Sequence, residues 1–151
     1  MKLVFITYII IVLDQNFIIN TDRLRKSKEL KVKVNFKASS DFLKLEESEI
    51  EFGEAVEVQG EVYIVDDQLI IHFDVLATVV SACRVCNGNA EAEIRIKDLY
   101  HAEDLNEVKG PYFDFGAVLR EEILLELPRF VECNQGSCPE RELIKPYLVE
   151  N

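Results

Sequence analysis

Residues 55–83 read AVEVQGEVYIVDDQLIIHFDVLATVVSAC, and this stretch decides the fold. Ala55–Val65 alternates between apolar and polar side chains, which is typical of a β-strand with one buried face. The acidic pair Asp66-Asp67 then predicts a tight turn. Gln68–Cys83 is rich in β-branched residues and is apolar on both sides near its middle. We therefore expect a β-hairpin whose second arm is the central strand of a sheet.

Two further alternating segments flank this hairpin in the sequence. Leu30–Phe36 places apolar side chains on one face and Lys31, Lys33 and Asn35 on the other. Ala90–Lys97 places alanine and isoleucine on one face and charged side chains on the other. Because both segments have the two-residue period of a half-buried strand, they extend the hairpin into an antiparallel meander of at least three strands.

The pattern changes after these strands. We expect the polar, acidic stretch Tyr100–Gly110 to be a loop. Asp114–Leu127 has helical spacing, with Asp114 as a predicted N-cap and Pro128 as the stop. Pro139–Tyr147 is a candidate for one more short helix. The apolar face of the main helix holds Phe115, Val118, Leu119, Ile123 and Leu127.

The length and composition limit the number of domains and the kinds of partner. A chain of 151 residues that is 48% hydrophobic suits a single domain with a substantial core. Its 28 acidic and 17 basic residues give a net charge of −11, which argues against a protein that covers nucleic acid with a positive surface. The predicted class is α+β: an antiparallel β-meander or partly open barrel, one main covering helix (114–127) and a cysteine-paired C-terminal segment.

The first 16 residues stand apart as an apolar N-terminal extension, and residues 17–151 form the expected single domain. The apolar run Leu3–Leu13 has 11 residues, whereas a transmembrane helix needs roughly 20, so we expect no membrane span. A lysine followed by an apolar run is similar to a secretory signal, but no small-residue cleavage site follows it. We therefore expect a cytoplasmic protein.

Four cysteines form the chemically most informative pattern. Cys83 and Cys86 are separated by two residues at the predicted hairpin tip, followed by Asn87-Gly88, which tolerates a positive φ. Cys133 and Cys138 are separated by four residues, and 46 residues lie between the two pairs. Four thiolates are the ligand set of a structural zinc site, so the four residues are candidates to bind one zinc ion per chain.

Three other interpretations of the cysteines stay open. Cys83 and Cys86 could form a redox pair, although such pairs usually stand at a helix N-terminus rather than between strands. The four cysteines could form two disulfides in an exported binding module. They could also remain two metal-free pairs in a reducing cytosol.

Other catalytic patterns are weak in this sequence. His72 lies in a strand segment and His101 in the expected loop, and neither has a serine or cysteine partner nearby in the chain. The six glycines are scattered and form no phosphate-binding loop. We expect a protein that is not an enzyme and has no small-molecule substrate.

Three passages give the chain a resemblance to a known family. LRKSKELKVKVNF (24–36) is similar to a basic opening strand, GEVYIVDDQLIIHFDVLATVVSACRVC (60–86) to a long hairpin ending in Cys-x-x-Cys, and LREEILLELP (119–128) to a characteristic helix. Over Phe17–Cys138 this combination resembles the bacterial and plastid YceD family, the large ribosomal RNA subunit accumulation proteins. The resemblance implies a non-enzymatic ribosome-biogenesis factor that supports synthesis, processing or stability of large-subunit (23S) ribosomal RNA.

The resemblance implies three kinds of partner: a large-subunit ribosomal RNA precursor, a ribosomal protein or an RNA-processing factor. The segment 23–37 holds seven basic residues and one acidic residue, and lysines two residues apart on a strand lie about 6.5–7 Å from one another, comparable to phosphate spacing. The same lysines could instead protect an edge strand from pairing with other chains. The acidic segment 41–61 could meet a basic ribosomal protein or remain a solvated face. The RNA-binding candidates are Arg23, Arg25, Lys31, Lys33 and Lys37.

Overall fold

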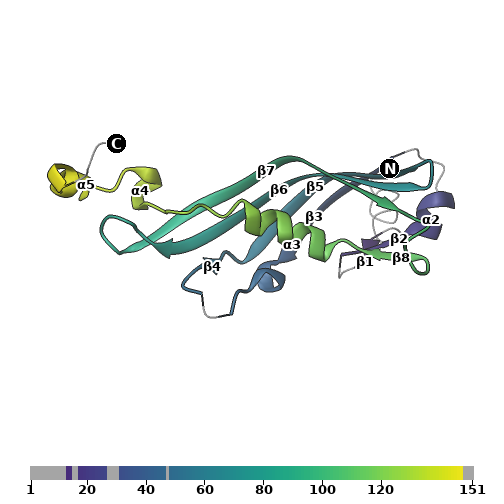
Figure 1. Cartoon of the computed structure of the whole chain (residues 1–151), viewed down its shortest axis with the longest axis horizontal. Helices are drawn as coiled ribbons and strands as arrows, with labels where there is room; N and C mark the ends of the chain where they lie inside the picture. Colours follow the sequence, from purple (N-terminus) through teal and green to yellow (C-terminus); the bar gives the residue numbers. More distant parts are fainter. Residues whose placement is uncertain (1–12, 15–16, 27–30, 47, 148–151) are drawn as a thin grey trace.

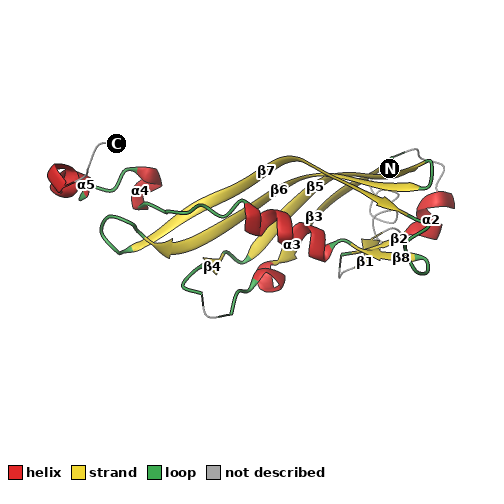
Figure 2. Ribbon diagram, in the orientation of Figure 1, coloured by secondary structure: helices red, strands yellow, loops and turns green. Residues whose placement is uncertain are grey.

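The computed structural model describes residues 13–14, 17–26, 31–46 and 48–147 of the chain. These residues form an elongated α+β structure with two antiparallel sheets, neither of them closed (Figures 1 and 2). The α+β class is therefore as predicted. Of the expected N-terminal extension, the structure describes only Leu13–Asp14. Residues 1–12 and 15–16 lie outside the described residues. Leu13–Asp14 form the short strand β1.

The main sheet is built on the predicted hairpin. Its strand order is β3-β5-β6-β4, and β7 pairs with β6 as well. The turn at Asp66 and Asp67 has φ values of 49° and 61°, which fits a two-residue hairpin turn. β6 is thus the central strand, as expected. The strands of this sheet are β3 (Val32–Ser39), β4 (Glu51–Phe52), β5 (Ala55–Val65), β6 (Gln68–Ala82) and β7 (Asn89–Asp104).

The prediction of a loop at Tyr100–Gly110 is wrong for the first half of this stretch, because β7 continues to Asp104 and pairs there with Gln68. The ladder between β6 and β7 shifts register between Phe73 and Val75. Asp98, opposite this shift, has a φ of 59° and donates its backbone N–H to Asp74 at 3.0 Å. Such a bulge inserts one residue and changes which face the following residues occupy. The alternation therefore breaks in the sequence while the strand itself continues.

A second, three-stranded sheet lies at the end of the molecule away from the C-terminal helices (Figure 1). It has the order β1-β2-β8, with β2 at Ile18–Asn20 and β8 at Tyr112–Asp114, and helix α2 (Thr21–Lys26) follows β2. Aromatic rings pack around Phe115, where the chain leaves this sheet. The centroid of the Phe115 ring lies 5.6 Å from that of Phe17 and 5.5 Å from that of Phe73.

Helix α3 (Gly116–Leu125) is the covering helix and is shorter than the predicted 114–127. It crosses one face of the main sheet (Figure 2). The predicted N-cap is wrong by one residue, because Asp114 ends β8 and Phe115 occupies the cap position. Asp114 still accepts a hydrogen bond from the Gly116 backbone N–H at 2.8 Å. The helix ends before Pro128, as expected.

The buried face of α3 gives a first testable prediction. Ile123 is fully buried in the hydrophobic core, whereas Leu125 on the same helix is exposed. We expect Ile123→Ala to lower the free energy of unfolding by about 2–5 kcal/mol, because it removes buried methyl groups and leaves a cavity. Leu125→Ala is the matched control and should change stability by no more than about 0.5 kcal/mol. Urea denaturation of both variants checks this, and equal losses would contradict it.

Short helical turns complete the fold. A 3-10 turn, η1 (Ser40–Leu43), follows β3. The C-terminal segment contains α4 (Cys133–Gly136), α5 (Arg141–Ile144) and the 3-10 turn η2 (Lys145–Tyr147). The last two together occupy most of the helix predicted at Pro139–Tyr147. Within the described ranges, no helix combines the length and the apolar character needed to cross a membrane.

Candidate metal centre

The first cysteine pair lies in the tight connection between β6 and β7. The Cys83 backbone N–H donates to the Gly88 carbonyl at 2.6 Å, and the Asn87 N–H donates to the Cys83 carbonyl at 2.9 Å. Asn87 adopts a φ of 60°, as its place after the cysteines predicted. The Val85 N–H points at the Cys83 sulfur at 3.4 Å. These bonds fold the tip around Cys83 and place a backbone N–H beside its sulfur.

The second pair reaches this tip through the chain that follows α3. Val131 forms an isolated parallel bridge with Cys83, and the Arg84 N–H donates to the Val131 carbonyl at 2.8 Å. Two residues later, the Cys133 N–H donates to the Cys83 sulfur at 3.3 Å. Backbone pairing therefore fixes Cys133 beside Cys83 although 49 residues separate them in the sequence.

A left-handed turn after Cys133 brings Cys138 back beside Cys83, Cys86 and Cys133. Asn134, Gln135 and Gly136 have φ values of 53°, 55° and 88°. The Gly136 N–H donates to the Glu132 carbonyl at 3.3 Å, and the Ser137 N–H donates to the Asn134 carbonyl at 3.1 Å. A left-handed conformation costs a non-glycine residue about 1–2 kcal/mol, so this turn needs compensating interactions close by.

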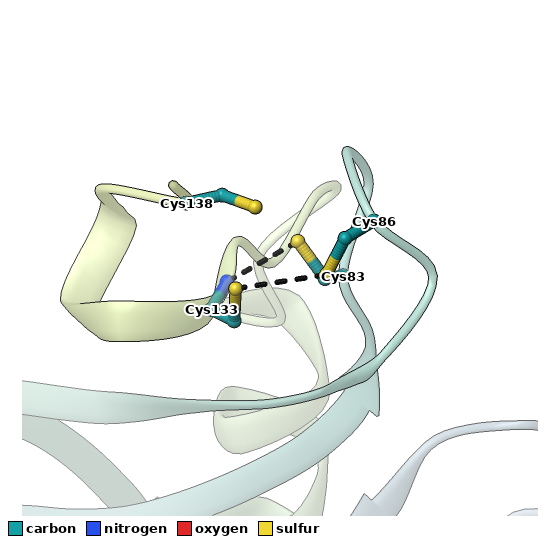
Figure 3. A group of neighbouring side chains, drawn as sticks. All are labelled: Cys83, Cys86, Cys133 and Cys138. Carbon is teal, nitrogen blue, oxygen red and sulfur yellow. Dashed lines mark hydrogen bonds between the residues drawn. The ribbon is translucent and has the colours of Figure 1, made fainter. Parts of the chain in front are cut away.

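The four sulfur atoms converge. The Sγ atoms of the two pairs all lie within 4.8 Å of one another, and those of Cys86 and Cys133 are 3.7 Å apart (Figure 3). A tetrahedral zinc ion with Zn–S bonds of about 2.3 Å separates its sulfurs by about 3.8 Å. None of the four cysteines is in a disulfide. The predicted meeting of the two pairs is confirmed, and the donor set fits a metal that prefers thiolates.

The electrostatics of the cluster are uneven. Burial disfavours the Cys83 thiolate, yet the backbone N–H groups of Cys133, Cys86 and Val85 outweigh burial and lower the Cys83 pKa to about 6. A hydrogen bond with the Cys138 side chain raises the pKa of Cys133, and burial raises the pKa of Cys138. The Cys83 thiol therefore ionises more easily than a free cysteine. The thiols of Cys133 and Cys138 ionise less easily, and a bound cation would favour the loss of their protons.

A lowered cysteine pKa is also typical of a redox pair, but the burial of Cys83 argues against that interpretation. Cys83 is only 2% exposed, whereas reactive cysteines lie in partly accessible surroundings. Its sulfur also accepts from the backbone of Cys133, in the other pair, rather than from the Cys86 segment alone. Amide donors to a buried sulfur are equally what a structural metal ligand requires.

One supporting ion pair was missed by the sequence analysis. Arg141 donates to Glu132 Oε1 from Nε at 2.8 Å and from Nη2 at 2.7 Å, and the Glu132 side chain is only 8% exposed. The Arg141 backbone N–H also donates to the Cys138 carbonyl at 3.1 Å. These contacts tie together the two ends of the loop that carries Cys133 and Cys138. A spacing of nine residues between a glutamate and an arginine carries no recognisable signal.

The predicted RNA-binding residues lie elsewhere, on α2, β3 and the residue before β3. Lys31 pairs with Glu61 at 3.4 Å and Lys37 with Glu57 at 3.0 Å. Arg25 lies 3.7 Å from Asp67. Of the five candidates, Arg23 and Lys33 have no carboxylate at ion-pair distance in the described part of the chain. Parts of the basic and acidic segments therefore pair with each other. Among the described strands of the main sheet, β3 lies at the edge, which suits the alternative of edge protection.

Both histidines have carboxylate neighbours. His72 Nε2 lies 3.2 Å from Asp98 Oδ1, and His101 Nε2 lies 2.8 Å from Glu103 Oε2. The His101 ring also stacks on Phe113, with centroids 6.1 Å apart. The group of potential metal ligands found among the described residues consists of the four cysteines alone.

Comparisons with models of protein families, with curated proteins and with solved structures found no match to this chain. The geometry by itself defines the class: an α+β protein whose open antiparallel sheet carries a closed cluster of four cysteines at one end. The resemblance to the YceD family stays a prediction.

Proposed function

We propose that this protein is a non-enzymatic ribosome-biogenesis factor whose four cysteines bind one structural zinc ion. The observation that carries the zinc assignment is the convergence of four sulfurs within 4.8 Å. Zinc sites that catalyse reactions keep one coordination position open, whereas four protein ligands fill the tetrahedron. A closed set of thiolates therefore favours a structural metal. The zinc ion would supply a cross-link between two distant chain segments.

The role in ribosome biogenesis is supported by the resemblance of three passages to the YceD family. In this proposal the protein is an adaptor between a large-subunit ribosomal RNA precursor and a ribosomal protein or RNA-processing factor. Its elongated form supports such a role, because the cysteine cluster and the three-stranded sheet lie at opposite ends (Figure 1). A cytoplasmic location belongs to the same proposal, since a reducing compartment keeps thiols available for metal.

Depletion of the protein in the organism that makes it tests the biological part of this proposal. We expect precursors of large-subunit RNA to accumulate, and the wild-type protein to sediment with pre-large-subunit particles at low salt. Cys133→Ser should fail to restore processing, because it removes one metal ligand. Ser137→Ala, an exposed residue in the same loop, is the matched control and should restore processing fully. Normal ribosomal RNA after depletion would count decisively against the proposed role.

A further inference from the structure

A hollow of about 280 Å³ adjoins the cysteine cluster and shares Cys83 with it. One wall comes from the tip between β6 and β7, including Arg84 and Asn87. The other wall is the extended chain after α3, including Arg129 and Phe130. Its volume is just below the roughly 300–1,000 Å³ seen for ligand pockets, which suits one unit of a polymer better than a large free ligand.

The charge of this hollow is opposite to that of the molecule. Two arginines line it, and none of its described lining residues carries a carboxylate. Within the described residues, neither Arg84 nor Arg129 has a carboxylate at ion-pair distance, in contrast to Arg25, Arg95 and Arg141. In a protein of net charge −11, two unpaired guanidinium groups on one small concave surface mark a site complementary to an anion.

An exposed aromatic ring adjoins these arginines. Phe130 is 65% exposed, and the Arg84 guanidinium carbon lies 4.5 Å from its ring centroid. A guanidinium that stacks on a ring keeps its N–H donors free at its edge, where they can bind a phosphate. The rest of the Phe130 surface is exposed and borders a second hollow lined in part by Glu91, Glu93 and Glu132, where the ring can stack against a planar, uncharged base. Arginine edges together with an open aromatic ring are the features that bind single-stranded RNA.

The two walls are held together before any ligand arrives. The Arg84 N–H donates to the Val131 carbonyl at 2.8 Å, so the arginine on the tip and the segment that carries Phe130 are joined through the backbone. The cysteine cluster joins the same two segments a few residues further on. A surface fixed in this way loses little conformational entropy when a ligand binds.

From these observations we infer that the hollow binds single-stranded RNA, with a phosphate on the Arg84 and Arg129 side chains and a base stacked on Phe130. The inference rests on the proposed function and adds to it a contact site separate from the basic residues of α2 and β3. An acidic peptide would use the arginines but would leave the exposed ring without a stacking partner. The ring therefore favours RNA as the occupant.

Fluorescence anisotropy with the reduced, metal-loaded protein tests the site. The probe is a labelled single-stranded RNA of about 12 nucleotides, within the roughly 4–16 nucleotides that single-strand binding folds cover. We expect Phe130→Ala to weaken binding roughly 5- to 150-fold, because the base has no ring to stack on. The double variant Arg84→Ala/Arg129→Ala should weaken it at least about tenfold and reduce the salt slope by roughly 0.7 for each phosphate that the protein no longer neutralises. Lys44→Ala/Lys109→Ala removes the same charge from exposed positions outside the hollow and is the control.

Each result bears on the inference. Variants that keep their zinc content and bind RNA more weakly than the control support it. Unchanged RNA affinity in both variants overturns it, as does zinc loss in the arginine variant, because the arginines would then serve the thiolates. Binding of an acidic peptide but not of RNA also overturns it. A wild-type protein that does not bind RNA, yet whose depletion still stops precursor processing, would refute this site and leave the proposed function standing.

Discussion

Purified under reducing conditions, the wild-type protein is expected to carry one zinc ion per chain, and the Cys133→Ser variant is expected to carry almost none. The sulfur of Cys133 lies 3.7 Å from that of Cys86, and the Cys133 backbone N–H donates to the Cys83 sulfur, so Cys133 contacts both cysteines of the other pair. Structural zinc contributes roughly 10–16 kcal/mol of binding free energy in zinc-finger peptides at neutral pH. Removal of one of four thiolates should therefore abolish stoichiometric binding.

The structural consequence should be local. The hydrophobic core extends from the aromatic cluster and the buried face of α3 as far as Cys83, Val131 and Cys138. The cysteine cluster itself joins only the β6–β7 tip to the segment that starts at Val131. We expect chelation or Cys133→Ser to raise hydrogen exchange strongly at the tip and in residues 131–138, with β5 and the middle of β6 still protected. Metal analysis together with hydrogen exchange measures both effects.

The control and the alternative outcomes are well defined. Ser137→Ala should retain one zinc and normal protection, since the Ser137 side chain is exposed and donates to none of the sulfurs. Zinc retained in Cys133→Ser would refute the four-cysteine site. A protein that contains no zinc and shows no free thiols until it is reduced would instead favour the exported, disulfide-stabilised module. A metal-free protein with four free thiols would favour the interpretation that the cysteines are two metal-free pairs in a reducing cytosol.

The second large effect is expected at Gly60. A Cβ atom at this position would overlap the backbone carbonyl oxygen of His72 and lie 2.8 Å from Cα of Phe73. It would also lie 2.9 Å from the Phe73 ring, which packs against Phe115 in the core. Neither the neighbouring strand nor the buried ring can move without breaking core contacts. We expect Gly60→Ala to lower the free energy of unfolding by more than about 4 kcal/mol, a loss of exceptional size for one methyl group.

The matched control for Gly60 is another glycine with open space around it. Gly110 has a φ of 80°, and a Cβ atom there would have no neighbour within 4 Å. Gly110→Ala should therefore cost only the roughly 1–2 kcal/mol of a left-handed backbone. Urea denaturation measures the free energy of unfolding of both variants. The loss in Gly60→Ala reports the steric clash, and the loss in Gly110→Ala reports backbone strain alone. A Gly60→Ala protein as stable as the Gly110→Ala protein would show that the two strands can separate at this point.

Periodicity explains why much of the sheet could be predicted. In β5, the buried residues Val56, Val58 and Val62 lie at even positions, and Gln68–Ala82 occupies the centre of the sheet. The alternation works because each strand has one face on the core and one in solvent. It failed at β7, where the bulge at Asp98 moves Leu99 to the inner face and hides the continuation to Asp104. A single inserted residue is invisible in a periodic pattern until the partner strand is known.

Charge patterns proved less informative than hydrophobic ones. Lys31 and Lys37 formed part of a strongly basic segment, yet in the folded protein each pairs with a glutamate of the acidic segment on β5. Arg84 and Arg129, which stood in no basic run, are the ones that share a hollow whose described lining residues carry no carboxylate. Charge along the chain does not give charge on a surface, because strand register decides which side chains become neighbours.

The sequence alone determined the strands of the hairpin, the helix after them, and the presence of two cysteine pairs, because these depend on residue types at short spacing. Only the tertiary structure decided that the pairs meet. Their meeting depends on the parallel bridge between Cys83 and Val131, the left-handed turn at residues 134–136 and the ion pair between Arg141 and the largely covered side chain of Glu132. Each of these joins atoms whose separation is set by the packing of distant segments, and no local spacing in the chain encodes that distance.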